Sequence, residues 1–162
     1  YLAAFARRDM DPPVTPATIL MDSPITVEWG QKTDEETWTP RNYDGDYRGP
    51  MSARHALERS INIPTVRVSL MAGLPFVLGA AKGAGIGSRL RGYPSVALGA
   101  FEISPMEIAG AYAVFANSGV RVAPNAIVGV MTGDGTVLDR KAAPLSPVSP
   151  SLPHKAGAEK EL

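Results

Sequence analysis

The chain of 162 residues contains no cysteine and only two histidines, His55 and His154. The absence of cysteine excludes disulfides and cysteine-ligated metal sites. The two histidines stand far apart in the sequence and do not form the H-E-x-x-H pattern of a metal-binding helix. We therefore expect no structural zinc site and no cofactor.

Net charge is also absent, because 16 basic residues balance 16 acidic ones. A nucleic-acid surface needs clustered Lys and Arg, so this balance argues against a nucleic-acid partner. No hydrophobic run approaches the roughly 18 residues of a membrane span, and no signal-peptide pattern is visible. The hydrophobic content of 44% and the charged content of 20% are typical of a globular protein.

The first half of the sequence predicts short helices separated by extended segments. Residues 1–8 have the pattern of the end of a helix. Residues 18–29 are rich in β-branched side chains around an Asp-Ser-Pro turn, which predicts short strands. Residues 38–50 carry one tryptophan and two tyrosines around an Asp-Gly turn; we expect these aromatic side chains to pack against the protein rather than contact a ligand. Ser52 is expected to cap a helix over residues 53–59.

The next segment is ambiguous in its periodicity. Residues 64–72 fit both the alternation of a strand and the spacing of a helix. Pro64 suits the first turn of a helix, and Gly73 is placed to end it. The glycine-rich run from Gly83 lacks the sixth-position glycine of G-x-G-x-x-G and comes after no clear strand, so we exclude a nucleotide-binding loop.

The clearest helix start in the sequence lies at Ser104. Ser104 and Glu107 have the spacing of a capping box, with proline at the first helical position. The helix carries Ile108, Tyr112 and Phe115 on one apolar face, whose burial the sequence does not decide.

The last part of the chain predicts a β-hairpin and then a tail. Residues 126–131 and 136–138 flank a Gly-Asp-Gly turn and are expected to pair. Residues 141–162 are rich in proline and poor in large apolar side chains, which predicts a disordered tail. The sequence thus predicts one domain over residues 1–140 and a loose tail over 141–162.

A short polar corner, Ser60-Ile61-Asn62, interrupts two apolar segments. Serine at a helix end and asparagine in a turn are ordinary caps, so capping is the first interpretation. A corner between two helices can also hold both side chains rigidly at a cleft. The hydroxyl could relay a proton, and the amide could donate to a substrate carbonyl and accept from a substrate amide.

The residues around this corner resemble a known family. The runs "WTPRNYDGDYRGPMSARHALERSINIPTVRVSLMAG" and "PSVALGAFEISPMEIAGAYAVFANSGV", with "GDGTVL" after them, closely resemble the transpeptidase domain of bifunctional class A penicillin-binding proteins. "YLAAF" resembles the helix that continues from the Ser-x-x-Lys motif of that family. The resemblance implies an α+β fold, here mostly helical with a β-hairpin, that is an incomplete β-lactamase/transpeptidase-like fold.

The resemblance also implies a chemistry. The family transfers acyl groups with the motifs S-x-x-K, S-x-N and K-T-G. It attacks D-Ala-D-Ala stem peptides of peptidoglycan and is acylated by β-lactams. By this resemblance, Ser60 is the serine of S-x-N and assists proton transfer, and Asn62 binds and orients the substrate amide. The family acts in the periplasm or at the outer face of the bacterial cytoplasmic membrane, so we expect membrane attachment only through a segment absent from this chain.

Two of the three motifs are missing from the sequence. No serine is followed three residues later by lysine, and no Lys-Thr-Gly occurs. We therefore expect a fragment of a D,D-transpeptidase that is inactive alone. The alternatives are a noncatalytic cell-wall interaction module with the same helical lobe, and a β-lactamase-type hydrolase. The long segment 38–50 and the helix after Ser104 favour the penicillin-binding protein over the hydrolase.

Overall fold

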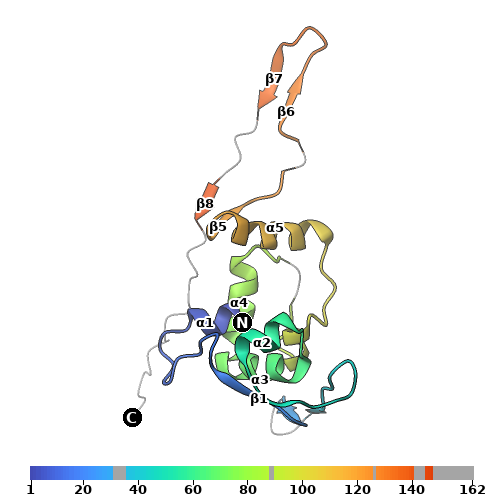
Figure 1. The fold of residues 1–162 in the computed structure, drawn as a ribbon. Coiled ribbons are helices and arrows are strands. Elements are labelled where there is room, and N and C mark those ends of the chain that lie inside the picture. The colour runs from blue at the N-terminus through green and yellow to red at the C-terminus, as the bar shows by residue number, and fades with distance from the viewer. Residues whose placement is uncertain (31–35, 88–89, 126, 141–144, 148–162) are drawn as a thin grey trace, which may run out of the picture. The chain divides into compact units, whose positions relative to one another are not determined.

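The computed structural model describes residues 1–30, 36–87, 90–125, 127–140 and 145–147. A short helix, a group of strands, a group of helices and a second group of strands follow one another along the chain, and the strands pair into two-stranded antiparallel sheets (Figure 1). The chain divides into two units. Among the described residues, the first comprises residues 1–30, 36–80 and 90–101, and the second comprises residues 81–87, 102–125, 127–140 and 145–147. The mixed composition of helices and small sheets agrees with the fold class predicted from the sequence.

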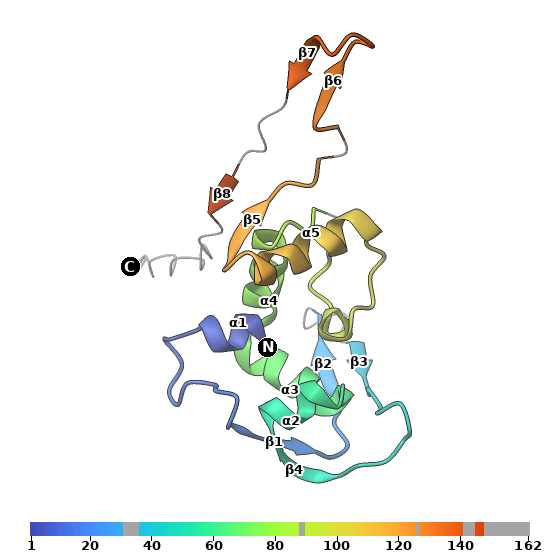
Figure 2. The same ribbon diagram turned by 45° about the horizontal axis from the view of Figure 1, so that its top comes forward.

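The first unit contains short helices and two strand pairs. Its helices are α1 (Leu2–Ala6), α2 (Ala53–Glu58), α3 (Asn62–Ala72), most of α4 (Leu74–Gly83) and the 3-10 helix η1 (Pro94–Leu98). Strand β1 (Ile19–Asp22) pairs with β4 (Gly49–Ser52), and β2 (Val27–Trp29) pairs with β3 (Glu36–Trp38). Figure 2 shows β1 and β4 beside α2 and α3, so the corner between these helices lies against a strand pair.

Helix α3 forms the centre of the first unit. Ile63, Val66 and Val68 are completely buried, and other core residues come from α1, β1 and α2. Because α3 is buried on several sides, its apolar residues do not follow one stripe, and this explains why the sequence pattern was ambiguous. The helix ends where predicted, at Gly73, whose φ of 83° is accessible to glycine without strain.

Side chains cap two of the helix ends in this unit. The Ser52 Oγ accepts a hydrogen bond from the His55 N–H at 3.2 Å, which confirms the predicted cap of α2. The Arg7 Nη1 donates to the Ala72 carbonyl oxygen at 2.8 Å, at the C-terminal end of α3. A cation at this end also interacts favourably with the helix dipole.

The aromatic side chains of residues 38–50 do not all pack as predicted. Tyr43 is fully exposed and Tyr47 is exposed, so the prediction is wrong for these two residues. The turn at Gly45 is present, with φ of 82°. The buried residues of this segment are Pro40 and Asn42.

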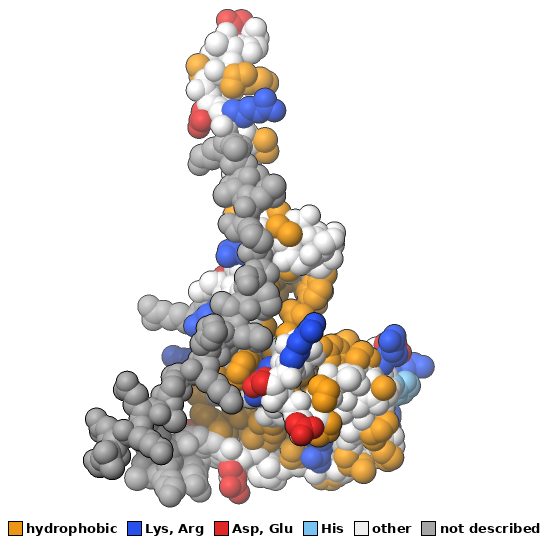
Figure 3. All heavy atoms as spheres, turned by 90° about the vertical axis from the view of Figure 1, so that its left-hand side faces the viewer, with side chains coloured by type: hydrophobic (Ala, Val, Ile, Leu, Met, Phe, Trp, Pro, Cys, Tyr) orange, Lys and Arg blue, Asp and Glu red, His pale blue; other side chains and the backbone are white. Residues whose placement is uncertain are grey.

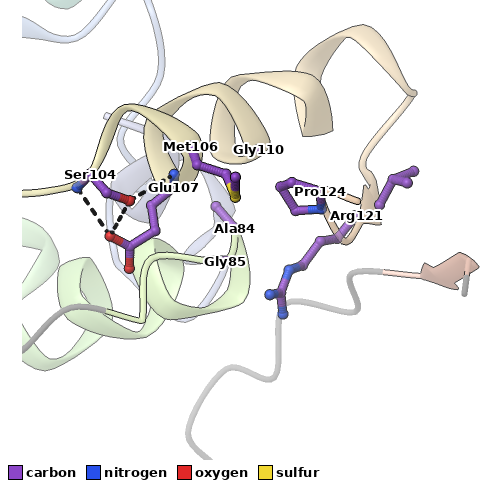
Figure 4. A pocket seen from close by; sticks show the side chains of 9 residues that line it. Ala84, Gly85, Ser104, Met106, Glu107, Gly110, Arg121 and Pro124 are labelled. Atoms are coloured by element: carbon purple, nitrogen blue, oxygen red, sulfur yellow. Dashed lines mark hydrogen bonds between the residues drawn. The ribbon is translucent and has the colours of Figure 1, made fainter. Parts of the chain in front are cut away.

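The second unit is built around one helix. Helix α5 (Pro105–Ala116) contacts strand β5 (Val120–Val122), which pairs with β8 (Leu145–Pro147). The capping box is present: the Ser104 Oγ accepts from the Glu107 N–H at 3.2 Å, and the Glu107 Oε2 accepts from the Ser104 N–H at 3.1 Å (Figure 4). This confirms the predicted start of α5.

The apolar face of α5 is exposed in this chain. Ile108, Tyr112 and Phe115 are exposed, by 40%, 70% and 64%. The buried residues of the helix are Ala111 and Val114. Small side chains allow the helix to approach its neighbours closely, so the larger apolar residues stay on the outer side. The Tyr112 and Phe115 rings contact each other, with centroids 6.1 Å apart.

The predicted hairpin is confirmed within this unit. Strand β6 (Gly129–Met131) pairs with β7 (Val137–Arg140). Residues 145–147 form β8, and residues 141–144 and 148–162 lie outside the described residues. The division into a domain over 1–140 and a tail over 141–162 therefore stays a prediction.

Among the described residues, no single helix is long and apolar enough to cross a membrane. Helices α3 and α4 reach that length and composition only as a pair, across a bend of 94°. In the space-filling view of Figure 3, basic and acidic side chains of the described residues are scattered among hydrophobic ones and do not gather into a patch of one sign on this face.

Candidate active-site corner

The corner at residues 60–62 is a tightly bonded junction between α2 and α3. The Ile61 N–H donates to the Ala56 carbonyl at 2.9 Å, and the Ser60 N–H donates to the Leu57 carbonyl at 3.1 Å. This pair of bonds is the Schellman motif, which satisfies the last carbonyls of a helix. Ile61 packs with Ala56 in a small buried cluster, which is the hydrophobic contact that usually accompanies the motif. The backbone of the corner is therefore fixed.

Ser60 occupies the left-handed position of this motif. Its φ is 53°, a conformation that glycine adopts most easily and that is strained for other residues. The side chain is exposed, and its hydroxyl has no hydrogen-bond partner among the described residues. Ser118 takes the same conformation at the end of α5, with φ of 52°. The backbone conformation alone therefore does not distinguish Ser60 from a residue at an ordinary helix end.

Asn62 is the first residue of α3, and its amide is held by one bond. The Nδ2 donates to the Arg41 carbonyl oxygen at 2.8 Å. A carbonyl can only accept, so the NH₂ group must face Arg41. The Oδ1 and the second N–H of this amide have no partner among the described residues. One donor and one acceptor of Asn62 thus remain for a ligand.

Two buried polar residues that the sequence did not reveal support the corner. The Asn42 Oδ1 accepts from the Ile63 N–H at 3.1 Å, and the Asn42 Nδ2 donates to the Asp22 Oδ1 at 2.7 Å. Asn42 is 6% exposed and Asp22 is 1% exposed. In the sequence, an aspartate at the end of an apolar strand was the one sign that Asp22 is buried. Its hydrogen-bond partner, Asn42, lies 20 residues away in a loop and could not be inferred.

The charge of Asp22 is compensated by Arg48. The Arg48 main-chain N–H donates to the Asp22 Oδ2 at 2.9 Å, and the Arg48 Nη1 lies 3.9 Å from the same oxygen. The Arg48 guanidinium also donates a hydrogen bond to Asp44. This hydrogen bond lowers the pKa of the Asp44 carboxyl and raises the pKa of Arg48. The contacts of Arg48 with Asp22 and with Asp44 therefore hold the loop before β4 in place.

Tyr1, the residue before α1, contacts the first turn of α3. The Thr65 Oγ1 donates to the Ile61 carbonyl at 2.7 Å, and the Tyr1 hydroxyl lies 3.2 Å from Thr65 Oγ1. The threonine proton is used by Ile61, so Tyr1 is the donor to Thr65. Burial raises the pKa of the Tyr1 hydroxyl, which keeps that proton in place.

Outside the corner, the described residues contain a pocket in the second unit but no group of metal ligands. None of them forms a group of three His, Cys, Asp or Glu side chains that could hold a metal ion. A small pocket at the start of α5 is lined in part by Ser104 and Glu107 (Figure 4). These two side chains serve the capping box, and Arg121 is the other charged residue that lines the pocket.

Comparison with known proteins identifies the family. The family model "Penicillin binding protein transpeptidase domain" matches residues 15–152. The chain belongs to this family. The matched range contains the whole corner and both supporting residues, Asn42 and Asp22.

Individual relatives agree with the family model. The chain is 34% identical over 139 residues to penicillin-binding protein 1B of Vibrio cholerae, a match that covers 85% of this chain and 17% of the relative. It is 35% identical over 123 residues to penicillin-binding protein 1A of Neisseria meningitidis, covering 75% of this chain and 15% of the relative. The chain thus spans about one sixth of the length of these curated relatives.

Solved structures show the same fold. Penicillin-binding protein 1A from Haemophilus influenzae is similar with a TM-score of 0.77 and 31% identity, over 90% of this chain and 21% of that one. A penicillin G acyl-enzyme complex of penicillin-binding protein A from Mycobacterium tuberculosis is similar with a TM-score of 0.68 over 92% of this chain and 38% of that one. Its identity of 18% shows a shared fold and no more.

Proposed function

We propose that this chain is part of a peptidoglycan D,D-transpeptidase and contributes the S-x-N motif of its active site. One observation carries this proposal. At a corner whose backbone groups are bonded, the Ser60 hydroxyl and one donor and one acceptor of the Asn62 amide lack partners among the described residues. Rigid positioning of unused polar groups is what a catalytic site requires.

The unused groups match the chemistry of a stem peptide. The free Asn62 Oδ1 can accept from a substrate amide N–H, and its free N–H can donate to a substrate carbonyl. The Ser60 hydroxyl can accept and donate a proton at once, as a relay to the leaving amine requires. A β-lactam presents a similar amide, so the same residues would orient it.

The covalent step needs groups that these 162 residues do not contain. The sequence has no Ser-x-x-Lys and no Lys-Thr-Gly, so neither the nucleophile nor its lysine can be assigned in it. We expect the 162-residue chain alone to form no acyl-enzyme. The full-length gene product would act at the outer face of the bacterial cytoplasmic membrane, where peptidoglycan is cross-linked.

The test is the Asn62→Ala variant of the full-length gene product. The rate of acylation by a fluorescent penicillin should fall about 100-fold, because one preorganised hydrogen-bonding group is lost. The melting temperature should change little, since the single bond to Arg41 is solvent-exposed and contributes about 1 kcal/mol at most. Ser60→Ala should also slow acylation without unfolding the protein.

Asn117→Ala is the matched control. The Asn117 Nδ2 also donates to a main-chain oxygen at a helix end, that of Val120, at 3.0 Å. This variant should lose the same kind of bond and keep its acylation rate. If Asn62→Ala and Asn117→Ala acylate equally fast per folded molecule, the Asn62 amide has only a structural role, the bond to Arg41. If the full-length product is never acylated, the noncatalytic interaction module replaces our proposal.

A further inference from the structure

The loop before β4 and the start of α3 are joined by two reciprocal asparagine bonds. The Asn62 side chain donates to the main-chain oxygen of Arg41 at 2.8 Å. The neighbouring Asn42 side chain accepts from the main-chain N–H of Ile63 at 3.1 Å. Each asparagine thus binds the main chain next to the other asparagine. The two bonds fix the loop and the helix start as one body.

The orientation of the Asn42 amide is set by Asp22. The Asn42 Nδ2 donates to the Asp22 Oδ1 at 2.7 Å and to the Asp46 carbonyl oxygen at 2.8 Å. A carboxylate and a carbonyl can only accept, so the NH₂ group must face them and the Oδ1 must face Ile63. With the carboxylate 1% exposed, no bulk water competes for this bond.

The Asn42 Oδ1 is the hydrogen-bond acceptor that the Ile63 N–H requires. The first N–H groups of a helix have no partner within the helix, and the next residue, Pro64, has no N–H to share the acceptor. Ile63 is completely buried. A buried N–H without a partner is costly, so the Asn42 Oδ1 is the group that allows α3 to begin at Asn62.

We propose that Asp22 and Asn42 are positioning residues for the Asn62 amide. The connection runs from the Asp22 carboxylate to the Asn42 side chain, through the main chain to the Arg41 carbonyl, and from there to the Asn62 Nδ2. This inference rests on the proposed function of Asn62. Asp22 and Asn42 lie outside the S-x-N motif. Through this connection they set the orientation of the unbonded Oδ1 and N–H of the Asn62 amide, and hence the acylation rate.

The first experiment measures acylation of the full-length gene product with Asn42→Ala. The rate constant at saturating fluorescent penicillin, per folded molecule, should fall about 10- to 100-fold, because a small misplacement of a positioning group is enough for such a loss. Val68→Ala is the control: Val68 is fully buried in the core of the same unit and lies outside the bonded chain. It should lower stability and leave that rate constant unchanged.

The second experiment exchanges the two residues. Asp22→Asn alone leaves a single oxygen to accept from both Asn42 and Arg48. Asn42→Asp alone places two carboxyl groups side by side in a buried site. The double variant D22N/N42D restores the bond between positions 22 and 42 and keeps an acceptor for Ile63. We expect it to acylate about tenfold faster than either single variant, as coupled residues do in a double-mutant cycle.

The third measurement does not require activity. In the ¹⁵N-labelled 162-residue chain, the Asn62 side-chain amide signal should shift in Asn42→Ala and return toward its original place in D22N/N42D. Val68→Ala should leave it unmoved. This spectroscopic comparison also covers the case in which Asn42→Ala folds too poorly for a rate measurement. The double variant keeps the bond between positions 22 and 42 and the acceptor for the Ile63 N–H, and of the Asn42 hydrogen bonds it loses only the one to the Asp46 carbonyl.

The outcomes separate this inference from the proposed function. An Asn62→Ala variant that acylates at full rate defeats the proposed function itself. A slow Asn62→Ala with an unchanged Asn42→Ala rate and an unmoved Asn62 signal overturns the positioning role alone. If the double variant acylates no faster than the single variants and its Asn62 signal is still displaced, Asp22 does not help to orient the Asn62 amide.

Discussion

Among single residues, Ser60 combines a strained backbone with an unused hydroxyl. Replacing it by glycine should raise the stability of the folded protein by about 1 kcal/mol, because glycine adopts positive φ without the steric cost. The same change should slow acylation of the full-length product, because the hydroxyl is lost. Thermal unfolding and fluorescent-penicillin labelling of Ser60→Gly measure both effects.

Ser118→Gly is the matched comparison, since Ser118 has nearly the same φ at the end of α5. It should stabilise by a similar amount and leave labelling unchanged. Should both variants label at the rate of the unsubstituted protein, the Ser60 hydroxyl takes no part in acylation.

The sequence revealed these residues unequally. Ser60 and Asn62 stand two positions apart, and their neighbours resemble a known family, so the motif could be predicted. Asn42 and Asp22 could not, because their pairing depends on a loop that brings residues 20 positions apart to 2.7 Å. A hydrogen bond between distant residues leaves no local pattern, and an asparagine after Pro40 and Arg41 looks like any turn residue.

At the scale of elements, the exposed face of α5 and the buried α3 should respond differently to truncation of a side chain. Tyr112 is 70% exposed, so Tyr112→Ala should change the free energy of unfolding by at most about 0.5 kcal/mol. Val68→Ala on α3, which is fully buried, should cost about 2 kcal/mol through lost burial and a residual cavity. Urea unfolding of both variants of the 162-residue chain tests the difference. A loss of several kcal/mol in Tyr112→Ala would show that this face is covered.

The elements themselves were predicted with uneven success for physical reasons. Helix ends could be placed because they depend on local sequence. Ser52 and Ser104 accept hydrogen bonds from N–H groups of the first helical turn, and Gly73 adopts the positive φ that ends a helix. Strand β3 was not predicted, since three residues give too short an alternation to recognise. The burial of the apolar face of α5 could not be predicted, because it depends on what packs against the helix, and the helix's own residues do not determine that.

For the whole molecule, the two units differ in how much they bury. Among the described residues, the buried hydrophobic side chains lie in the first unit, with the exceptions of Ala111 and Val114. Amide hydrogen exchange in the 162-residue chain should therefore be slowest in α3 and much faster in α5 and the β6–β7 hairpin, because opening free energies follow local burial. Equal protection in both units, with one sharp thermal transition, would instead support a self-sufficient interaction module.

Ile61 belongs to two helices at once. Its N–H completes the Schellman motif of α2, and the same residue is the N-cap of α3. The joint therefore has no spare residue to absorb a change in length. One inserted residue would rotate α3 by about 100° about its axis and turn its buried side chains away from the core. Insertions and deletions should be rejected at this joint even where they spare both Ser60 and Asn62, so the spacing of the motif is held by packing as well as by chemistry.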